Sequence, residues 1–333
     1  MKSIFLCEDK PCVHRVYVSG IVKKLVDTAG LDPVVYTKSE ILSTPKKFKD
    51  VEFIFSTWGM PAFTNEEVNA YLPALKCVFY AAGTVKFFAR GFFEAGIKVF
   101  SAAAANAIPV AETAAAQIIL ANKGFFQTSR VYKKEQYKQS RCILENCAGN
   151  YDTNVGIIGV GMIGKEVVRL LKNYHLNIFA YDPFLSDEKA AELGITKCDL
   201  PTLFNTCSTI SNHLADNAQT RGILTGKLFL SMLPNATFIN TGRGAQVVEN
   251  ELIDALEKRP DLTAVLDVTD PEPVTVGNPL YSLENCVLTP HIAGSQQKEV
   301  CRMAEYMLRE YEKYIQGQPT LYEVTLEMLK TMA

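Results

Sequence analysis

The stretch Asn154-Val155-Gly156-Ile157-Ile158-Gly159-Val160-Gly161-Met162-Ile163-Gly164 decides the fold predicted for this chain. An apolar run with β character ends at Gly159, and a helical pattern opens behind Gly164. At G-x-G-x-x-G spacing, the first glycine permits a tight turn, the second lets the backbone approach a pyrophosphate, and the third lets the helix pack on its strand. Free N–H groups at the helix start, around Met162 and Ile163, would hold the phosphates. The stretch therefore predicts a dinucleotide-binding turn.

An acidic residue at the end of the next strand narrows the choice of dinucleotide. The segment 176–181 has the pattern of a strand and is followed by Asp182, close to the roughly twenty-residue offset at which a carboxylate meets an adenosine ribose. Pro183 and Phe184 come next, so no basic side chain stands ready for a 2′-phosphate. These features favour NAD over NADP, and a structural glycine turn in some other α/β unit is the alternative.

Length and composition are typical of a globular protein with about two domains. The chain has 333 residues, of which 48% are hydrophobic and 21% are charged. The net charge of −2 provides no general field for nucleic acid or an anionic membrane, and we find no run of about twenty apolar residues. The N-terminal apolar run is too short for a signal peptide. We therefore expect a cytoplasmic protein that binds neither nucleic acid nor membrane.

The nine cysteines predict neither a metal site nor disulfides. Cys77, Cys207 and Cys286 lie inside apolar runs, where a free thiol behaves as a small hydrophobic side chain. No pair has C-x-x-C spacing, and no histidines cluster beside the cysteines. We expect reduced, mostly buried thiols and no metal.

Residues 1–102 alternate between strand and helix patterns, which is typical of a doubly wound parallel sheet. The expected strands are Ser3–Cys7, Val34–Tyr36, Val51–Ser56, Cys77–Tyr80 and Val99–Phe100. The expected helices are Val16–Ala29, Asn65–Leu72 with Thr64 as its N-cap, and Val85–Ala95. Loops at the C-terminal ends of such strands face the ligand crevice. Trp58 and the loop at Ala82 and Gly83 are therefore candidate substrate contacts, with a core tryptophan and ordinary connections as the alternative.

The alternation resumes after a central segment and predicts a six-stranded dinucleotide-binding domain. The alanine-rich segment 102–121, with Pro109 near an expected helix start, leads into a basic and aromatic stretch at 123–141. We expect that stretch to be a solvated or subunit-contacting arm rather than a nucleic-acid site. The further strands are expected at Asn177–Tyr181, Thr209–His213, Thr237–Asn240, Thr263–Val268 and Val287–Leu288, and the helices at Glu166–Lys172, Lys227–Met232, Glu249–Lys258 and Gln296–Tyr314. The last helix would return the chain to the first domain.

Three polar residues follow three successive strands of this second domain: Arg243, Glu272 and His291. The C-terminal ends of parallel strands form one crevice. Arg243 can hold a substrate carboxylate bidentately and polarise the adjacent carbonyl. His291 can exchange a proton with that oxygen, and Glu272 would orient the imidazole and raise its pKa. Beside a nicotinamide, this set predicts hydride transfer at the carbon that bears the oxygen. Singly, each residue also fits a surface ion pair, a capped loop or a turn.

The same segments resemble the successive signatures of the D-isomer-specific 2-hydroxyacid dehydrogenase family. They are Val155–Gly164 with Asp182, Ile239–Gly244, Leu266–Val268 through Glu272-Pro273, Leu288–Gly294, and Asn106 through Val110-Ala111-Glu112. The resemblance covers nearly the whole chain in the right order. It implies that Arg243, Glu272 and His291 are catalytic, and that Asp267 holds the nicotinamide carboxamide. Further cofactor contacts are expected at His213, for which a structural role is the alternative, and at Thr241, Gly242 and Gly294.

The resemblance also implies an architecture and an oligomeric state. A Rossmann-type NAD domain, residues 103–294, would be inserted into a flavodoxin-like substrate domain made by residues 1–102 and 295–333. The chain would form a homodimer through the helix near Ala111 and the arm after it. The chain ends at Ala333, so we expect a member without the regulatory domain of some phosphoglycerate dehydrogenases.

Departures from the family pattern concern the substrate. The loop Ala81-Ala82-Gly83-Thr84-Val85-Lys86 has fewer glycines than the usual carboxylate-binding loop and lacks its Asp. Gly242 stands where Ala or Ser is usual, and Glu272 stands where formate dehydrogenases have Gln. These departures leave the substrate side chain open.

We therefore predict an NAD-dependent oxidoreductase that transfers a hydride between nicotinamide and C2 of a small 2-hydroxy or 2-keto acid. It would be similar to glyoxylate/hydroxypyruvate reductases or to 3-phosphoglycerate dehydrogenase. The alternative is an NADH-sensing protein with weak or no turnover, because corepressors that resemble this family keep the same three residues.

Overall fold

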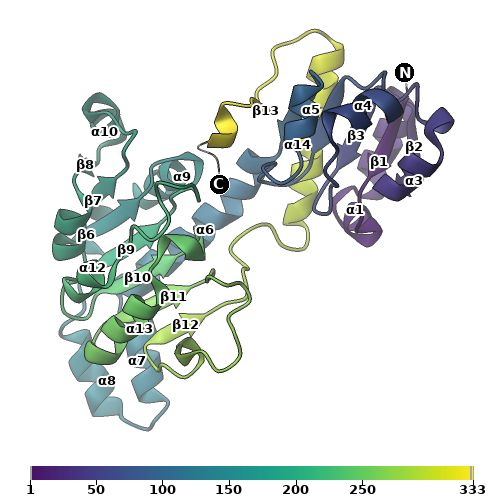
Figure 1. The fold of residues 1–333 in the computed structure, drawn as a ribbon. Coiled ribbons are helices and arrows are strands. Elements are labelled where there is room, and N and C mark those ends of the chain that lie inside the picture. Colours follow the sequence, from purple (N-terminus) through teal and green to yellow (C-terminus); the bar gives the residue numbers. More distant parts are fainter. Residues whose placement is uncertain (1, 331, 333) are drawn as a thin grey trace. The chain divides into compact units, whose positions relative to one another are not determined.

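A computed structural model describes residues 2–330 and 332. The described chain divides into two compact units, of which the second runs from Ala107 to Gly294 and the first is made by the residues on either side of it. Each unit is built around one sheet with helices packed on its faces (Figure 1). This confirms the predicted α/β class with two doubly wound parallel sheets.

The described part of the first unit contains a six-stranded sheet with the order β13-β5-β4-β3-β1-β2. Its parallel strands are β1 (Ser3–Leu6), β2 (Leu31–Tyr36), β3 (Phe53–Ser56), β4 (Cys77–Tyr80) and β5 (Lys98–Ser101), and β13 (Glu323–Val324) adds to the β5 edge antiparallel. The order β2-β1-β3-β4-β5 is flavodoxin-like, as predicted. The helices are α1 (Lys10–Val16), α2 (Ser19–Ala29), α3 (Lys38–Ser43), α4 (Asn65–Tyr71), α5 (Arg90–Glu94) and α14 (Glu299–Ile315), with 3-10 turns at Pro45–Lys47 and Met328–Lys330.

Both faces of this sheet are buried, which explains its continuous apolar strands. Phe5, Phe53 and Phe79 belong to one core cluster, which includes residues of α14. Their neighbours along the strands, such as Ile4 and Ile54, belong to the cluster on the other face. Because side chains alternate along a strand, a sheet covered on both sides needs apolar residues at every position.

Three helical details of the first unit differ from the prediction. The helix expected at Val85–Ala95 is only α5, Arg90–Glu94. The expected helix Val16–Ala29 is two helices, because Asp9 caps an earlier start at Lys10 and the chain turns at Tyr17. Helix α3 was not predicted, although its capping box, Thr37 with Glu40, is a sequence signal for a helix start. The expected N-cap of α4, Thr64, is confirmed and forms a capping box with Glu67.

The second unit contains a parallel sheet for which seven strands are described, in the order β12-β11-β10-β9-β6-β7-β8. They are β6 (Tyr151–Ile158), β7 (His175–Tyr181), β8 (Thr196–Lys197), β9 (Thr209–Asn212), β10 (Thr237–Asn240), β11 (Thr263–Leu266) and β12 (Cys286–Leu288). Counted from β6, the first six follow the Rossmann order 3-2-1-4-5-6. The prediction of six strands omitted β8, whose two exposed residues show no apolar pattern.

The helices of this unit include the predicted Glu249–Lys258 with identical bounds. They are α6 (Ala103–Asn122), α7 (Phe125–Tyr132), α8 (Tyr137–Leu144), α9 (Met162–Leu171), α10 (Asp187–Leu193), α11 (Leu200–Thr206), α12 (Gly226–Leu230) and α13 (Glu249–Lys258), with 3-10 turns at Gly244–Gln246 and Pro279–Tyr281. The arm expected at 123–141 is therefore largely helical.

Helix α6 begins earlier than expected. Pro109 lies inside it rather than near its start, because the preceding alanines favour helix and Ser101 Oγ accepts a hydrogen bond from the Ala103 N–H. By length and composition alone α6 could cross a membrane, whereas the sequence analysis found no such run. Its face with Ala111, Ala114 and Ile118 lies in the core of the second unit, which accounts for its apolar character.

Candidate active site

The glycine turn joins β6 to α9 with geometry that only glycines allow. Gly159 has a φ of +88°, and a Cβ there would lie 2.8 Å from the His213 carbonyl carbon. A Cβ on Gly164 would lie 2.0 Å from the Gly159 carbonyl oxygen, so a side chain would push α9 off its strand. At Gly161 a Cβ would meet no atom within 4 Å. The backbone at Gly161 therefore faces open space, as a site for a pyrophosphate requires.

Asp182 ties the end of β7 to this turn. One carboxylate oxygen accepts a hydrogen bond from the Val160 N–H at 2.7 Å, and the other accepts one from the Phe184 N–H at 2.8 Å. Each oxygen keeps a lone pair for a further donor, such as a ribose hydroxyl. The turn and Asp182 together fit the adenosine half of a dinucleotide.

Glu272 and His291 contact each other directly. The distance from His291 Nδ1 to Glu272 Oε1 is 2.6 Å, and both side chains are partly exposed, at 46% and 41%. Because Nδ1 is directed to the carboxylate, Nε2 is the ring nitrogen that can exchange a proton with a ligand. The pair therefore has the arrangement of an oriented acid–base histidine.

Arg243 lies in the loop after β10, the strand next to β11. The loops after β10, β11 and β12 carry Arg243, Glu272 and His291, so the three side chains come from neighbouring parallel strands. Arg243 Nη1 donates to the Gly242 carbonyl at 2.7 Å. Within the described residues Arg243 forms no ion pair, so its charge remains for an anionic ligand. Among the described residues, no hydrogen bond joins Arg243 to Glu272 or His291.

Asp267 folds the loop that carries His291. Its buried carboxylate accepts hydrogen bonds from the N–H groups of Ile292 and Ala293 and from the Thr289 hydroxyl, at 2.8, 2.9 and 2.5 Å. Its carbonyl accepts the His291 N–H at 3.1 Å. His291 has a φ of +54°, which is uncommon for residues other than glycine. Asp267 thus holds the His291 backbone in this conformation, while its predicted contact with nicotinamide stays a prediction.

The remaining predicted cofactor residues lie in the loops that follow β9, β10 and β12. His213 is buried, with Nε2 3.0 Å from Ser211 Oγ and Nδ1 3.4 Å from Thr241 Oγ1. Burial lowers the pKa of His213 to about 3, so the ring is neutral at physiological pH. Gly242 is buried in the turn before Arg243, and Gly294 is half-buried at the end of the second unit.

The predicted substrate contacts in the first unit differ in exposure. Trp58 is partly buried, and the guanidinium of Arg15 lies 5.6 Å from its ring centroid. Ala82 is fully buried, whereas Gly83 and Thr84 in the same loop are partly exposed. Ser101 Oγ donates to the carbonyls of Ala82 and Gly83 at 3.1 and 2.5 Å. Ser101 thereby anchors the loop from the end of β5.

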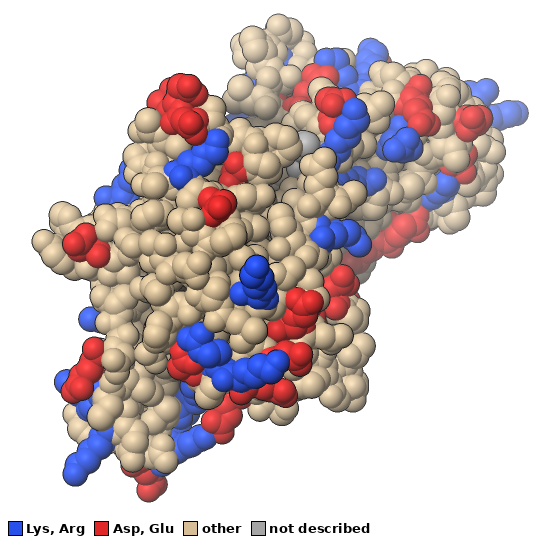
Figure 2. All heavy atoms as spheres, turned by 60° about the vertical axis from the view of Figure 1, so that its left-hand side comes forward, with Lys and Arg blue, Asp and Glu red and all other residues tan. Residues whose placement is uncertain are grey.

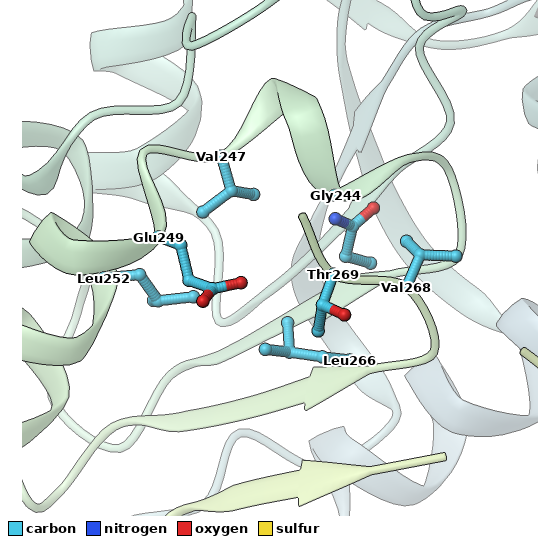
Figure 3. A pocket seen from close by; sticks show the side chains of 8 residues that line it. Gly244, Val247, Glu249, Leu252, Leu266, Val268 and Thr269 are labelled. Carbon is cyan, nitrogen blue, oxygen red and sulfur yellow. The ribbon is translucent and has the colours of Figure 1, made fainter. Parts of the chain in front are cut away.

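The volume of the pocket behind the Arg243 turn is smaller than that of a substrate molecule. Its cavity volume is about 10 Å³, roughly the space of one water molecule. Its lining residues are Asn240, Gly244, Val247, Glu249, Leu252, Leu266, Val268 and Thr269. In Figure 3 the Glu249 carboxylate, at the start of α13, extends toward Thr269. That carboxylate accepts hydrogen bonds from Asn278 and from the Asp270 N–H, and so braces the loop that carries Glu272.

The cysteines are free thiols that differ in burial. All nine cysteines are free, and Cys142 in α8 is exposed. Burial raises the pKa of Cys7, Cys77 and Cys207 to about 12, which keeps these thiols protonated. In the part of the chain that the structure describes, no group of three or more His, Cys, Asp or Glu could hold a metal ion.

Comparison with known proteins assigns this site to a family. Residues 115–293 match the model for the NAD-binding domain of D-isomer-specific 2-hydroxyacid dehydrogenases. The chain belongs to that family. NAD is the cofactor of the matched domain, and the open backbone at Gly161 and the carboxylate of Asp182 fit it.

Several dehydrogenases are similar to this member of the family. The D-3-phosphoglycerate dehydrogenase of Archaeoglobus fulgidus is 30% identical over 71% of this chain and 44% of its own length. The (S)-sulfolactate dehydrogenase of Chromohalobacter salexigens is 30% identical over 60% of this chain and 64% of its own. The chain thus spans about half the length of the curated relatives it matches.

Solved structures share the fold. The apo D-mandelate dehydrogenase of Rhodotorula graminis has a TM-score of 0.81 at 20% identity, with 97% of each chain covered. A phosphoglycerate oxidoreductase from Rhizobium etli has a TM-score of 0.79 at 19% identity, with 98% of this chain and 99% of that chain covered. At this identity the likeness supports the two-unit 2-hydroxyacid dehydrogenase fold alone.

The structure explains one departure from the family sequence and adds residues that the sequence analysis missed. A Cβ on Gly242 would lie 3.0 Å from Asn212 Nδ2 and 3.1 Å from Gln246 Oε1. Those two buried amides would therefore have to give way by a few tenths of an ångström to admit Ala or Ser. Asn212 and Asn240 each end a fully buried strand, where an amide side chain is a signal in the sequence. Gln246 had no such signal.

Proposed function

We propose that this protein is an NAD-dependent oxidoreductase acting at C2 of a small 2-hydroxy or 2-keto acid. The observation that carries the proposal is the contact between His291 Nδ1 and Glu272. The two residues lie in the loops after β12 and β11, and Arg243 follows the neighbouring strand β10. The bound cofactor supplies or accepts the hydride. Arg243 holds the substrate carboxylate, His291 Nε2 donates or accepts the proton of the C2 oxygen, and Glu272 stabilises the charged imidazole.

Two classes of substrate are compatible with the proposal, and they differ in the substrate side chain. The names of the relatives favour acids with a second anionic group, as in 3-phosphoglycerate and sulfolactate. Unphosphorylated acids such as glyoxylate and hydroxypyruvate form the other class. We assign the first-unit contacts to Trp58 and to the backbone at Ala82 and Gly83. The comparisons name dehydrogenases, so the NADH-sensing alternative is not favoured.

The domain roles and the partners belong to the same proposal. We assign nucleotide binding to residues 103–294 and substrate loops to residues 1–102 and 295–333. We further propose a cytoplasmic homodimer that contacts neither nucleic acid nor membrane. Its interface would use the helix near Ala111 and the arm formed by α7 and α8. Figure 2 shows positive and negative side chains interspersed on the visible face, which supports the absence of a polyanion partner.

Turnover of 2-keto acids by two variants tests the function. NADH oxidation is measured with glyoxylate, hydroxypyruvate, phosphohydroxypyruvate, pyruvate and branched 2-keto acids. With the best of these, His291→Ala should lower kcat by about 10²–10⁴-fold, the usual contribution of a general acid, while the Kd for NADH stays unchanged. Arg243→Ala should raise KM and lower kcat together, because it removes the carboxylate contact.

Two outcomes would contradict the proposal. Wild-type turnover in either variant would remove these residues from the mechanism. Tight NADH binding without turnover of any acid would favour the sensor.

A further inference from the structure

A group of buried amide side chains lies directly behind the turn that carries Arg243. Asn212 ends β9, Asn240 ends β10, and Gln246 closes the 3-10 turn after Arg243. Each of the three side chains is 0% exposed. Amide groups at this depth must find hydrogen-bond partners inside the protein, because burying them without partners is costly.

The amides bond to one another across the ends of the two strands. Asn212 Nδ2 donates to Asn240 Oδ1 at 3.0 Å and to Gln246 Oε1 at 2.5 Å. Gln246 Nε2 donates to the Leu214 carbonyl at 2.6 Å, and the Leu214 N–H donates to Asn212 Oδ1 at 3.3 Å. These hydrogen bonds form a closed ring from Asn212 through Gln246 and Leu214 back to Asn212. Neither amide side chain can rotate without breaking a hydrogen bond of the ring.

The same amides hold the backbone of the arginine turn on both sides. The Arg243 N–H donates to Gln246 Oε1 at 3.3 Å, and Asn240 Nδ2 donates to the Arg243 carbonyl at 3.1 Å. The Gly242 N–H donates to Asn240 Oδ1 at 3.1 Å. Both peptide groups that flank the Arg243 Cα are therefore held by side chains, which restricts the direction in which the guanidinium leaves the turn.

We propose that Gln246 and Asn212 are positioning residues for Arg243, an inference that rests on the proposed function. A guanidinium fork grips a carboxylate bidentately only within a narrow range of distance and angle. The amides set that geometry from below without touching the ligand. Gly242 contributes to this arrangement, because a Cβ there would lie in tight contact with the Asn212 and Gln246 side chains.

The test is a cycle of variants at positions 246 and 243. Gln246→Met keeps the size of the side chain and removes its hydrogen bonds. It should raise the KM of the best 2-keto acid about tenfold, within the range expected for a misplaced binding group, and leave the Kd for NADH unchanged. In an Arg243→Lys background, whose ammonium lacks the planar fork, the same change should cost less than about threefold, because residues that act through one another are not additive.

A buried amide elsewhere in the same sheet provides the control. Asn285, at the start of β12, is buried and donates to the Leu256 carbonyl at 3.0 Å. Asn285→Leu should lower Tm without changing the KM of the keto acid. Wild-type KM in Gln246→Met, or an undiminished effect in the Arg243→Lys background, would overturn the inference. Wild-type turnover and its loss in His291→Ala test the proposed function separately, so the two failures are distinguishable.

Discussion

The two histidines of the second unit that the sequence singled out have opposite environments. His291 is exposed beside Glu272, while His213 is buried between Ser211 and Thr241. With its pKa lowered to about 3 by burial, His213 stays neutral through the physiological range and cannot act there as an acid. Its titration instead affects the stability of the fold.

His213 should make the protein less stable as the pH falls. Between the folded pKa of about 3 and the unfolded value near 6.5, the unfolded chain binds more protons than the folded protein. The free energy of unfolding therefore decreases as the pH is lowered through this range. His213→Asn removes this effect and keeps polar atoms near both partners. From pH 7 to pH 5 the wild type should lose about 2 kcal/mol more than the variant. Reversible urea unfolding at the two pH values measures the difference, and equal losses would contradict the buried, neutral ring.

At the scale of elements, the predicted nucleotide site is formed by segments that follow one another in the chain: β6, the glycine turn, α9 and β7. Strand β6 pairs with β7 in parallel, which brings Asp182 beside Val160. Helix α9 can start there only because Gly164 lacks a side chain. Asp182 therefore braces the turn, and its contact with the ribose stays a prediction.

Removing the Asp182 carboxylate should weaken NADH binding and relax the choice of cofactor. Asp182→Ala loses the bond to the Val160 N–H and a charged contact with the ribose hydroxyls. The Kd for NADH should rise about 10–100-fold, since hydrogen bonds to charged groups contribute roughly 1.5–3 kcal/mol. The preference for NADH over NADPH should shrink as well. Fluorescence titration measures both constants.

Asp187→Ala is the matched control for that experiment, because Asp187 is an exposed acid whose carboxylate contacts Lys197. Its Kd should equal that of the wild type. An unchanged Kd in Asp182→Ala would exclude Asp182 from the site.

At the scale of the whole molecule, the arm α7–α8 leaves aromatic side chains in solvent. Tyr132 and Tyr137 are each 59% exposed, and their rings contact each other at 5.7 Å. Aromatic residues are enriched in protein interfaces. This exposure supports the proposed dimer contact through the arm.

Charge placed on the arm should separate the subunits. In Tyr132→Asp/Tyr137→Asp, two carboxylates would be buried against a second copy without partners, so we expect a monomer where the wild type is a dimer. Size-exclusion chromatography with light scattering gives the mass. Tyr151→Asp, at an exposed tyrosine at the start of β6, should remain dimeric. A monomeric wild type, or a dimeric double variant, would rule out this interface.

The sequence by itself determined the two doubly wound sheets and the glycine turn. Strand alternation, helical periodicity and glycine spacing act over a few residues, so they can be read without knowing what packs against them. The placing of Arg243, Glu272 and His291 after successive strands followed from the same local patterns. Short elements escaped this reasoning, because β8 and α3 carry too few apolar residues to show a period.

Only the tertiary structure decided how the site residues are held. Asn212 and Gln246 are 34 positions apart in the chain, and Asp267 is 25 positions from the Ile292 N–H that it accepts. Such contacts depend on which strand ends become neighbours and in what register. The same holds for the burial of His213, whose contact with the cofactor stays a prediction. Local patterns predict the reacting groups, whereas the packing of distant segments fixes the orientation of their side chains.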